Sequence, residues 1–505
     1  MSSARCLRQS FPLDMLAVDR TSDMSLHRQL HRALVKMIQD RTLAAGTALP
    51  STRELAADLA LARNTIIAAY DQLVTEGYLV NRQGARYVVV DLPLLPKLQT
   101  PSLIIPSERP LSVRGTALMH QPFHHGSPGC FAFHPGMPDA HNFPFGVWGR
   151  LLARRASFAG DSLFGTYHVT GLPELKEAIL GYLASSRGVI CTKEQIVITT
   201  GAQAAFDLLA RLLLDPGDRV WMEEPGYYGA KAAFTVAGAD VRPMPVTLEG
   251  WQMGRPPKNI RLIYVTPACQ HPLGTSMRMD QRLQLLELAE RSNAWIIEDD
   301  FDGEYRFQGR PVPAVHGMDR SGNVIYVGTF AKLLFPALRL GFMVLPPGLC
   351  DRIHPALSTT GQFPPLFLQA ALADFIVEGH MSRHLKRMRR IYAGRRQFFY
   401  WICEERLSDY MQLLNAEAGI QVVGHLRKGL SDIQISEAAT RLGINVSPLS
   451  KYYQHETPIQ GLVLGYAACN KAQTELGIGQ LERAFEEHIR VFRPIPGDSG
   501  TIKLV

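Results

Sequence analysis

The sequence has few of the features that mark secreted, metal-binding or membrane proteins. Cysteine is scarce: there are seven in 505 residues, an odd number, and none forms a C-x-x-C pair. That excludes a disulfide framework and a cysteine zinc cluster, and free thiols are typical of a reducing compartment. The opening "MSSARCLRQSFPLDML" lacks the apolar core of a signal peptide, and no run is long enough to cross a bilayer. We therefore expect a cytoplasmic protein with no membrane partner.

Charge and histidine are also unremarkable. The net charge of +7 is a mild excess that does not by itself imply nucleic acid. The pair His124–His125 lies in the predicted linker without a cluster of cysteine or carboxylate partners around it, so we expect no metal site. With 46% apolar and 20% charged residues the chain is of globular type, and its length predicts two or three domains.

Residues 20–90 read as a small unit of their own. Apolar residues recur at helical spacing from Leu26 to Ile38, and Ser51 or Thr52 is placed to cap a second helix, "RELAADLA". A third helix, "NTIIAAYDQLVTEGYL", precedes "VNRQGARYVVV", which reads as two short strands around Gly84. A helix, two helices joined by a tight turn and a hairpin together predict a winged helix-turn-helix.

The residues expected to meet DNA lie at the start of the predicted recognition helix, on the preceding helix and in the wing. Residues 1–90 contain eleven lysines and arginines against eight acidic residues, a net charge of +3. The candidates for contact with double-stranded DNA are Arg53, Arg63, Asn64, Thr65, Arg82 and Arg86.

The rest of the chain divides into a linker and a large α/β domain. Residues 91–130 are dotted with proline and show no sustained period, so we expect an extended linker. Residues 131–495 alternate short Val- and Ile-rich runs with helical patterns, which predicts a mostly parallel sheet covered on both faces. The C-terminal part of this range predicts a smaller α+β subdomain.

Several reactive groups follow the predicted strands of this domain. Gly201-Ala202-Gln203 follows "IVITT" and opens a helix, which suits a phosphate, and Asp299 closes "WIIED". Thr329 and Lys332 follow "VIYVGT", with Arg339 further on. Each feature alone has a structural explanation, such as a turn, a cap or a solvated loop lysine. Together, a phosphate cradle, a buried carboxylate and an isolated lysine are the parts that pyridoxal 5′-phosphate requires.

The motifs also resemble those of a known family. They include "LPSTRELAADLALARNTIIAAYDQLVTEGYL", "ITTGAQAAFDLLARLLLDPGD", "EEPGYYGA", "VTPACQHPLG", "IEDDFDGEYRF", "VIYVGTFAKLLFPALRLGF" and "PLSKYY". The sequence resembles, over residues 25 to 470, the MocR/GabR-type regulators. In these proteins a GntR-type winged helix is fused to an aminotransferase-like domain of pyridoxal-phosphate fold type I.

The resemblance implies a role for each matching residue. Lys332 would form the Schiff base, Asp299 would pair with the pyridine nitrogen and Tyr227 would stack on the ring. The phosphate would be held by Thr329, Arg339, Ala202 and Gln203, with Tyr167 reaching the phosphate of a neighbouring subunit. The implied protein is a homodimeric transcriptional regulator that senses an amine, an amino acid or pyridoxal phosphate itself.

Four departures from the family pattern concern the cofactor site. Phe301 stands where a tyrosine usually donates to the cofactor's phenolic oxygen, which removes a hydrogen bond worth roughly 1.5–3 kcal/mol. Ala331 replaces a usual serine, and Cys269 and Gln421 each replace a common histidine.

A fifth departure concerns the substrate. Val463 occupies the position of the arginine that grips a substrate carboxylate in aminotransferases of this fold. The favoured interpretation is thus a sensor rather than an enzyme, with a residual transamination half-reaction left open. Two alternatives remain: an aminotransferase with an appended DNA-binding domain, and a regulator whose large domain is a cofactor-free scaffold.

Overall fold

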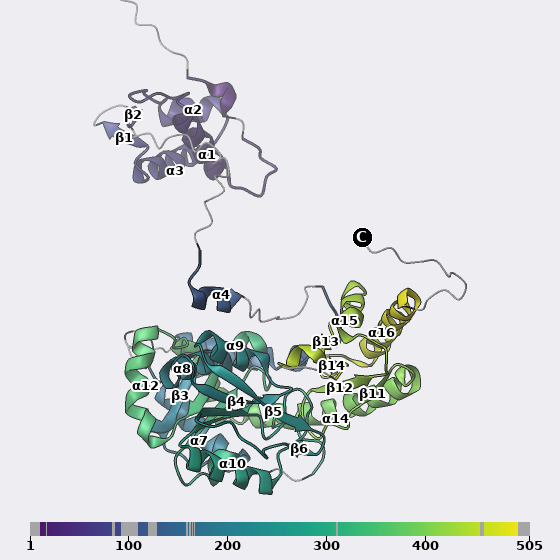
Figure 1. The fold of residues 1–505 in the computed structure, drawn as a ribbon. Helices are drawn as coiled ribbons and strands as arrows, with labels where there is room; N and C mark the ends of the chain where they lie inside the picture. Colours follow the sequence, from purple (N-terminus) through teal and green to yellow (C-terminus); the bar gives the residue numbers. More distant parts are fainter. Residues whose placement is uncertain are drawn as a thin grey trace, which may run out of the picture. The chain divides into compact units, whose positions relative to one another are not determined.

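The computed structural model describes residues 11–16, 18–82, 86–91, 110–119, 129–157, 160, 163, 165, 167–309, 312–454 and 459–492. These residues form two compact units, which divide between Arg109 and Pro110 (Figure 1). No helix in the described ranges is long and apolar enough to cross a bilayer. The predicted turn at Gly84 and the pair His124–His125 lie outside the described residues.

The first unit is the predicted winged helix. Its core is closed by side chains at helical spacing, including Leu34, Ile66 and Leu73, each of which is fully buried. The side chain of Ser51 accepts the backbone N–H of Glu54 at 3.2 Å and the Glu54 carboxylate accepts that of Ser51 at 2.8 Å, so the predicted cap is a complete capping box. The elements are η1 (Leu13–Met15), α1 (Leu26–Gln39), α2 (Thr52–Asp58), α3 (Arg63–Thr75) and the antiparallel pair β1 (Leu79–Arg82) and β2 (Arg86–Val89).

The segment expected to be an extended linker contains a helix. In α4 (Val113–Met119) the hydroxyl of Ser112 accepts the backbone N–H of Gly115 at 3.0 Å, which caps the first turn. The helix belongs to the second unit and contacts α9 (Tyr228–Val236) there. The prediction of an extended linker is therefore wrong for these residues, because a helix of two turns is too short to show a period in the sequence.

The second unit is built on an eight-stranded sheet with the order β3-β10-β9-β8-β7-β4-β5-β6. Strands β9, β8, β7, β4 and β5 run parallel, whereas β10 lies antiparallel between β3 and β9. All residues of β3 and β9 are buried, as expected for strands covered on both faces. The strands are β3 (Ile196–Thr199), β4 (Arg219–Glu224), β5 (Asp240–Thr247), β6 (Gly250–Trp251), β7 (Ile260–Val265), β8 (Trp295–Asp300), β9 (Val324–Thr329) and β10 (Gly341–Val344).

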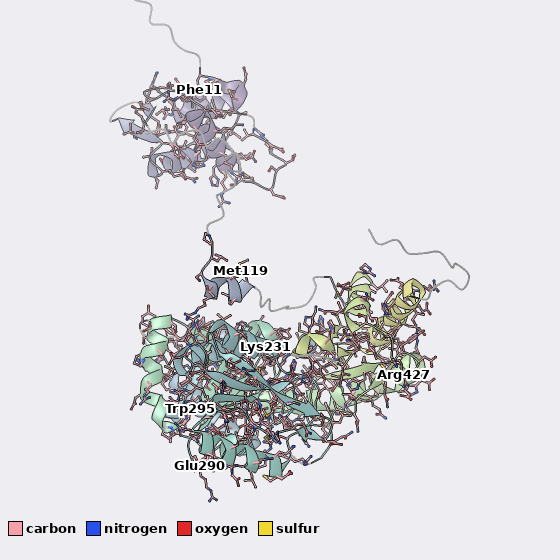
Figure 2. All side chains as sticks on the ribbon, viewed as in Figure 1. Phe11, Met119, Lys231, Glu290, Trp295 and Arg427 are labelled. Carbon is pink, nitrogen blue, oxygen red and sulfur yellow. The ribbon has the colours of Figure 1, made fainter. Side chains whose placement is uncertain are left out.

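Helices cover both faces of this sheet. On one face α8 (Ala202–Leu213), α9 and α12 (Pro347–Thr360) enclose one apolar cluster. On the other face lie α5 (Phe145–Ser157), α7 (Pro173–Ser186), α10 (Met279–Ser292) and α13 (Leu366–Val377). The side chains of Glu290 on α10 and of Arg427 are exposed (Figure 2). The remaining short helices are η2 (Ala140–Asn142), η3 (Lys193–Gln195), α11 (Val315–Met318) and η4 (Pro336–Leu338).

A smaller α+β subdomain follows, as predicted. Its four-stranded sheet has the order β11-β12-β14-β13 and is antiparallel throughout. The long helix α14 (His380–Leu407) leads into it, and α15 and α16 contact one another beside it. The other elements are β11 (Met411–Leu413), β12 (Gln421–Leu426), α15 (Asp432–Arg441), β13 (Ser447–Pro448), η5 (Leu449–Tyr452), β14 (Gly461–Gly465) and α16 (Lys471–Phe492).

Candidate functional site

The candidate site lies at the carboxyl ends of the parallel strands. Asp299 is near the end of β8, and Thr329 ends β9 three residues before Lys332. Gly341 of β10 pairs with both Thr329 and Thr199, so the ends of β9 and β3 meet on either side of one residue. In open α/β sheets this edge is where ligands bind.

Lys332 is held against the backbone of a distant loop. Its Nζ donates to the carbonyl oxygen of Gly136 at 2.6 Å. Gly136 has a left-handed φ of +65°, and a Cβ on it would lie 2.0 Å from that Nζ. Burial lowers the pKa of Lys332, although the charges of Asp302 and Asp299 oppose the shift. The structure therefore presents an amine that is easier to deprotonate than an ordinary lysine.

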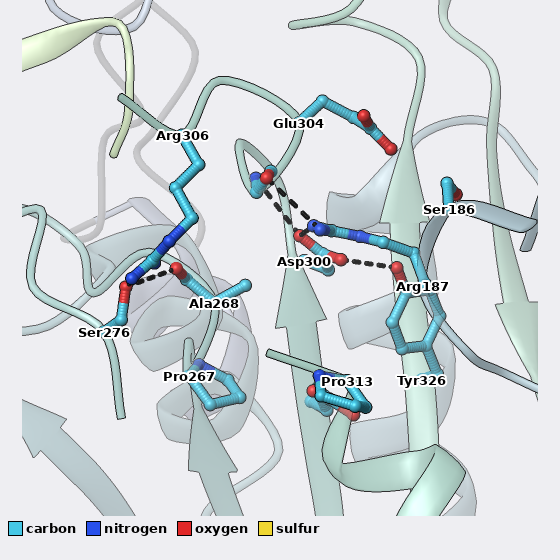
Figure 3. Close-up of polar contacts among 12 residues, drawn as sticks. Ser186, Arg187, Pro267, Ala268, Ser276, Asp300, Glu304, Arg306, Pro313 and Tyr326 are labelled. Carbon is cyan, nitrogen blue, oxygen red and sulfur yellow. Dashed lines mark hydrogen bonds and ion pairs between the residues drawn. The ribbon is translucent and has the colours of Figure 1, made fainter. Parts of the chain in front are cut away.

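Three consecutive acidic residues end β8, and two of them have structural partners. Glu298 accepts the backbone N–H groups of Val315 at 2.9 Å and of His316 at 2.8 Å. Asp300 is bound by Arg187 and by the hydroxyl of Tyr326, the latter at 2.6 Å (Figure 3). These two carboxylates tie the strand to its neighbours.

Asp299 is the third, and it points to the opposite face of the strand because side chains alternate. Its Oδ2 accepts the hydroxyl of Tyr264 at 2.6 Å, whereas its Oδ1 has no hydrogen-bond partner among the described residues. The residue is only 4% exposed. Burial raises the pKa of Asp299 to about 7, although the Tyr264 hydrogen bond opposes the shift. A buried acceptor without a partner is costly unless a ligand supplies the donor.

The start of α8 forms a second polar region. Gly201 precedes the helix with φ +96°, and the guanidinium of Arg339 lies 3.9 Å from the position of a Cβ on Gly201. The side-chain oxygen of Gln203 is buried without a partner among the described residues, while its Nε2 donates to the Gly229 carbonyl at 2.8 Å. Free N–H groups at a helix start beside an arginine favour a phosphate.

The hydroxyl of Thr329 is occupied within the loop that follows β9. It accepts the backbone N–H of Ala331 at 3.2 Å, and Thr329 itself is 8% exposed. Ala331 therefore still engages the threonine through its backbone, although the serine hydroxyl expected there is absent.

His271 is a central residue that the sequence analysis missed. Its ring meets Tyr227 edge-on at 5.4 Å, Phe301 at 5.3 Å and Tyr452 at 5.3 Å, measured between ring centroids. Its Nδ1 lies 3.4 Å from Nε2 of Gln421. Two of the departures from the family pattern, Phe301 and Gln421, therefore meet at the same imidazole. A single histidine in a loop carries no periodic signal, and only the quoted motif "TPACQHPLG" contained it.

The environment keeps this imidazole neutral. Burial, reinforced by the nearby charge of Lys332, lowers the pKa of His271 to about 3. At neutral pH the ring therefore acts as a polar aromatic wall rather than as a cation.

The two remaining candidate positions are a buried apolar residue, Val463, and an exposed tyrosine, Tyr167. Val463 is fully buried on β14, opposite Val423, and belongs to an apolar cluster with Leu449. Tyr167 is 80% exposed, and its ring packs edge-on against Phe363 at 5.8 Å. Among the described residues, the ring contact of Tyr167 is with Phe363, whereas the amine of Lys332 contacts Gly136.

The predicted DNA-contacting residues lie in the first unit. Arg53 is exposed on α2, and Arg63 and Asn64 are exposed at the start of α3, where Thr65 is half-buried. The Nε of Arg63 lies 3.4 Å from the hydroxyl of Thr52, at the start of α2. The wing candidates are Arg86, exposed at the start of β2, and Arg82 at the end of β1, whose side chain is not described.

A basic run of the sequence, "HLKRMRRIYAGRR" (residues 384–396), forms part of α14, and most of its arginines contact groups within the chain. Arg389 pairs with Glu304, Arg395 pairs with Asp139 at 2.8 Å, and Arg396 donates to the Ala416 carbonyl at 2.7 Å. These contacts favour a structural role for the run over a second DNA-binding track.

Comparison with known proteins assigns both units. The family "Bacterial regulatory proteins, gntR family" matches residues 26–89, and "Aminotransferase class I and II" matches residues 138–475. A kynurenine aminotransferase of Pyrococcus horikoshii, solved in complex with PMP, has a TM-score of 0.65 and 26% identity, over 75% of this chain and 95% of that one.

Full-length relatives share both units in one chain. The "Probable rhizopine catabolism regulatory protein MocR" of Rhizobium meliloti is 48% identical over 474 residues, 93% of this chain and 96% of that protein. The pyridoxine biosynthesis regulator PdxR of Corynebacterium glutamicum is 29% identical over 458 residues, 90% of this chain and 94% of that protein. The chain therefore belongs to the MocR-type transcriptional regulators, which join a GntR-family DNA-binding domain to an aminotransferase-like domain.

Proposed function

We propose that this regulator binds pyridoxal 5′-phosphate in its aminotransferase-like domain and uses it to sense a small molecule. The effector is an amine, an amino acid or the cofactor itself, and the output is binding of operator DNA. The proposal rests on two groups at the same edge of the sheet. One is the buried Lys332, whose pKa is lowered, and the other is the buried carboxylate of Asp299, whose Oδ1 has no hydrogen-bond donor among the described residues. The proposed division is 20–90 for the DNA-binding domain, 91–130 for the linker and 131–495 for the effector domain.

The residues present fit the cofactor at each of its ends. Asp299 offers the unpartnered Oδ1 that a protonated pyridine nitrogen needs, and such a partner would return the pKa of Asp299 toward its ordinary range. Tyr227 provides a ring face, with Phe301 nearby across His271. The proposed phosphate ligands are Thr329, Arg339, Ala202 and Gln203, and Lys332 is the proposed point of covalent attachment.

When bound, pyridoxal phosphate supplies an aldehyde that condenses reversibly with primary amines. The chain itself holds Lys332 against the Gly136 carbonyl. Its burial of His271 keeps that imidazole neutral. A primary amine that competes with Lys332 would release this lysine from its place. Release of a buried side chain is a local change that a two-state domain can transmit.

A sensor role is supported by the apolar strand position at Val463, which offers no clamp for a substrate carboxylate. Relatives named as transcriptional regulators support the same role. A residual half-reaction with an amine stays compatible with the site, because Lys332 can also move protons.

The proposed partners are double-stranded DNA and a second copy of the chain. The exposed groups at the start of α3 and on β2, including Arg63 and Arg86, would meet the operator. The 80% exposure of Tyr167 fits a side chain that reaches a neighbouring subunit. A dimer would place two such units on paired half-sites.

The test is the visible absorption of the full-length protein after loading with pyridoxal phosphate and dialysis. The wild type is expected to retain a visible band, Lys332→Ala to lose it, and the surface control Lys193→Ala to retain it. A band that survives in Lys332→Ala would refute the assignment of that lysine. A wild type that stays colourless would refute cofactor binding and leave the cofactor-free scaffold, which Phe301 and Ala331 favour.

A further inference from the structure

The polar groups around Lys332 share one property: they are acceptors or neutral groups. Both charged side chains that act on the lysine amine are carboxylates, Asp302 and Asp299. The side-chain oxygen of Gln421 lies on the same side, 3.5 Å from the position of a Cβ on Gly136. His271, which Gln421 contacts, is a neutral imidazole.

Asp302 has no role in the proposed attachment of the cofactor. It is 1% exposed, and its Oδ2 accepts the backbone N–H of Ile420 at 2.7 Å. Its Oδ1 has no hydrogen-bond partner among the described residues. A buried oxygen of this kind favours a ligand that brings a hydrogen-bond donor and disfavours a second carboxylate.

The arginines near this region are already committed. Arg187 is bound to Asp300, and Arg306 donates to Ser276 (Figure 3). Arg306 also pairs with Glu417 at 3.0 Å. Arg339 lies beside Gly201, at the end assigned to the phosphate. In the part of the chain that the structure describes, these contacts leave none of these three guanidinium groups beside the lysine to receive a carboxylate.

The strand of the smaller subdomain offers no cation either. Val463 on β14 is fully buried, faces an apolar cluster and pairs with Val423 and Ser447. A ligand that carries a carboxylate next to its amino group would therefore place a negative charge among acceptors and apolar side chains. The cost of such an unpaired charge is far larger than that of a neutral hydroxyl.

We propose that the effector taken up at Lys332 is a primary amine that carries hydroxyl donors and no carboxylate, and that Asp302 with the Gln421–His271 pair selects it. The inference rests on the proposed function and narrows it to one ligand class. It excludes ordinary amino acids as the physiological signal.

The test uses probe pairs that differ only in a hydroxymethyl group or a carboxylate: ethanolamine and glycine, alaninol and alanine, serinol and serine. Each is titrated into the full-length, cofactor-loaded protein by calorimetry and by the change in visible absorption. The measurement is made at about pH 8, above the pKa of about 7 to which burial raises Asp302, so that this carboxylate is ionised. The amino alcohol of each pair is expected to bind at least about tenfold more tightly than its amino acid.

A second measurement examines Asp302 itself. Asp302→Asn keeps an oxygen for the Ile420 N–H and removes the charge, so the preference for the amino alcohol is expected to fall several-fold. The exposed control Asp351→Asn is expected to leave it unchanged, and equal thermal midpoints would show that both variants are folded.

The outcomes distinguish an error in the ligand class from an error in the cofactor assignment. A visible band that requires Lys332, with amino acids bound as tightly as the amino alcohols, overturns the inference and leaves the cofactor assignment standing. The same holds if a loaded protein binds neither member of any pair. A protein that never acquires the band overturns the proposed function itself.

Discussion

Replacement of Gly136 by alanine would test whether the backbone of this residue holds the lysine in place. The new Cβ would stand 2.0 Å from Nζ of Lys332, and an ordinary contact needs about 3.4 Å. The amine must therefore move by more than an ångström, away from the carbonyl that it now contacts at 2.6 Å. A misplacement of this size at a reacting atom costs about a hundredfold in rate. We expect Gly136→Ala to slow attachment of pyridoxal phosphate by about that factor.

A matched control separates this effect from backbone strain. Gly136 has φ +65° and Gly361, at the end of α12, has φ +62°, but a Cβ on Gly361 would meet nothing within 4 Å. Alanine in the left-handed region costs about 1–2 kcal/mol at either site. The lost Lys332–Gly136 hydrogen bond adds about 1 kcal/mol to the first variant alone. Both variants should thus remain folded with similar, modest losses of stability.

The assay is the rate at which the visible band appears after addition of cofactor, together with the urea midpoint of each variant. Gly361→Ala is expected to load at the wild-type rate. If Gly136→Ala also loads at that rate, the close approach of backbone and amine does not position the lysine, and the reasoning fails.

The remaining predictions concern the protonation of Asp299, the ring of Phe301 and the binding of DNA by Arg63. Without cofactor, the folded protein holds a proton on Asp299 up to about pH 7, whereas the unfolded chain releases it near 3.8. Stability therefore falls as pH rises between these values, by up to about 4 kcal/mol from this residue, and Asp299→Asn should flatten that dependence in urea unfolding measured from pH 4 to 7. An unchanged slope would contradict the raised pKa. Phe301→Tyr restores a hydroxyl beside the ring and should tighten cofactor binding, measured by equilibrium dialysis, by about 1.5–3 kcal/mol; weaker binding would argue against this placement. Arg63→Ala should weaken operator binding by about 1–3 kcal/mol in a mobility-shift titration, and the α14 control Arg390→Ala should not. If both variants weakened binding equally, the DNA contact could not be assigned to α3 of the first unit.

The order of elements was largely predictable from the sequence, but their neighbours in space were not. Short buried runs and helical spacing identified the winged helix and the strands of the large sheet, because each pattern is local. The run "LGFMVLP" predicted a strand, yet its insertion between β3 and β9 in the antiparallel direction has no local signal. The helix α4 was missed for the opposite reason, since its seven residues are too few to show a period.

The candidate site likewise contains some residues that the sequence could predict and others that it could not. The positions of Lys332 and Asp299 at one edge of the sheet were predictable, because Asp299 lies near the end of β8 and Lys332 follows β9. Gly136, His271 and Gln421 come from loops and a strand of the second sheet that lie far apart along the chain. No spacing in the sequence links them, and only the closed fold brings them to one lysine.

The end of β8 has a consequence for how this family can vary in length. Three carboxylates stand in a row, and the alternation of the strand alone decides which one faces Tyr264 and the candidate site. Removal of a single residue between Trp295 and Glu298 would shift Asp299 into the place of Glu298, which accepts the N–H groups of Val315 and His316, and would turn Asp300 toward the candidate site. The number of residues in the strand thus sets the direction of each side chain. The strand tolerates substitutions but not changes in length. Insertions and deletions in functional relatives are therefore expected outside this strand, where the count of residues carries no chemical meaning.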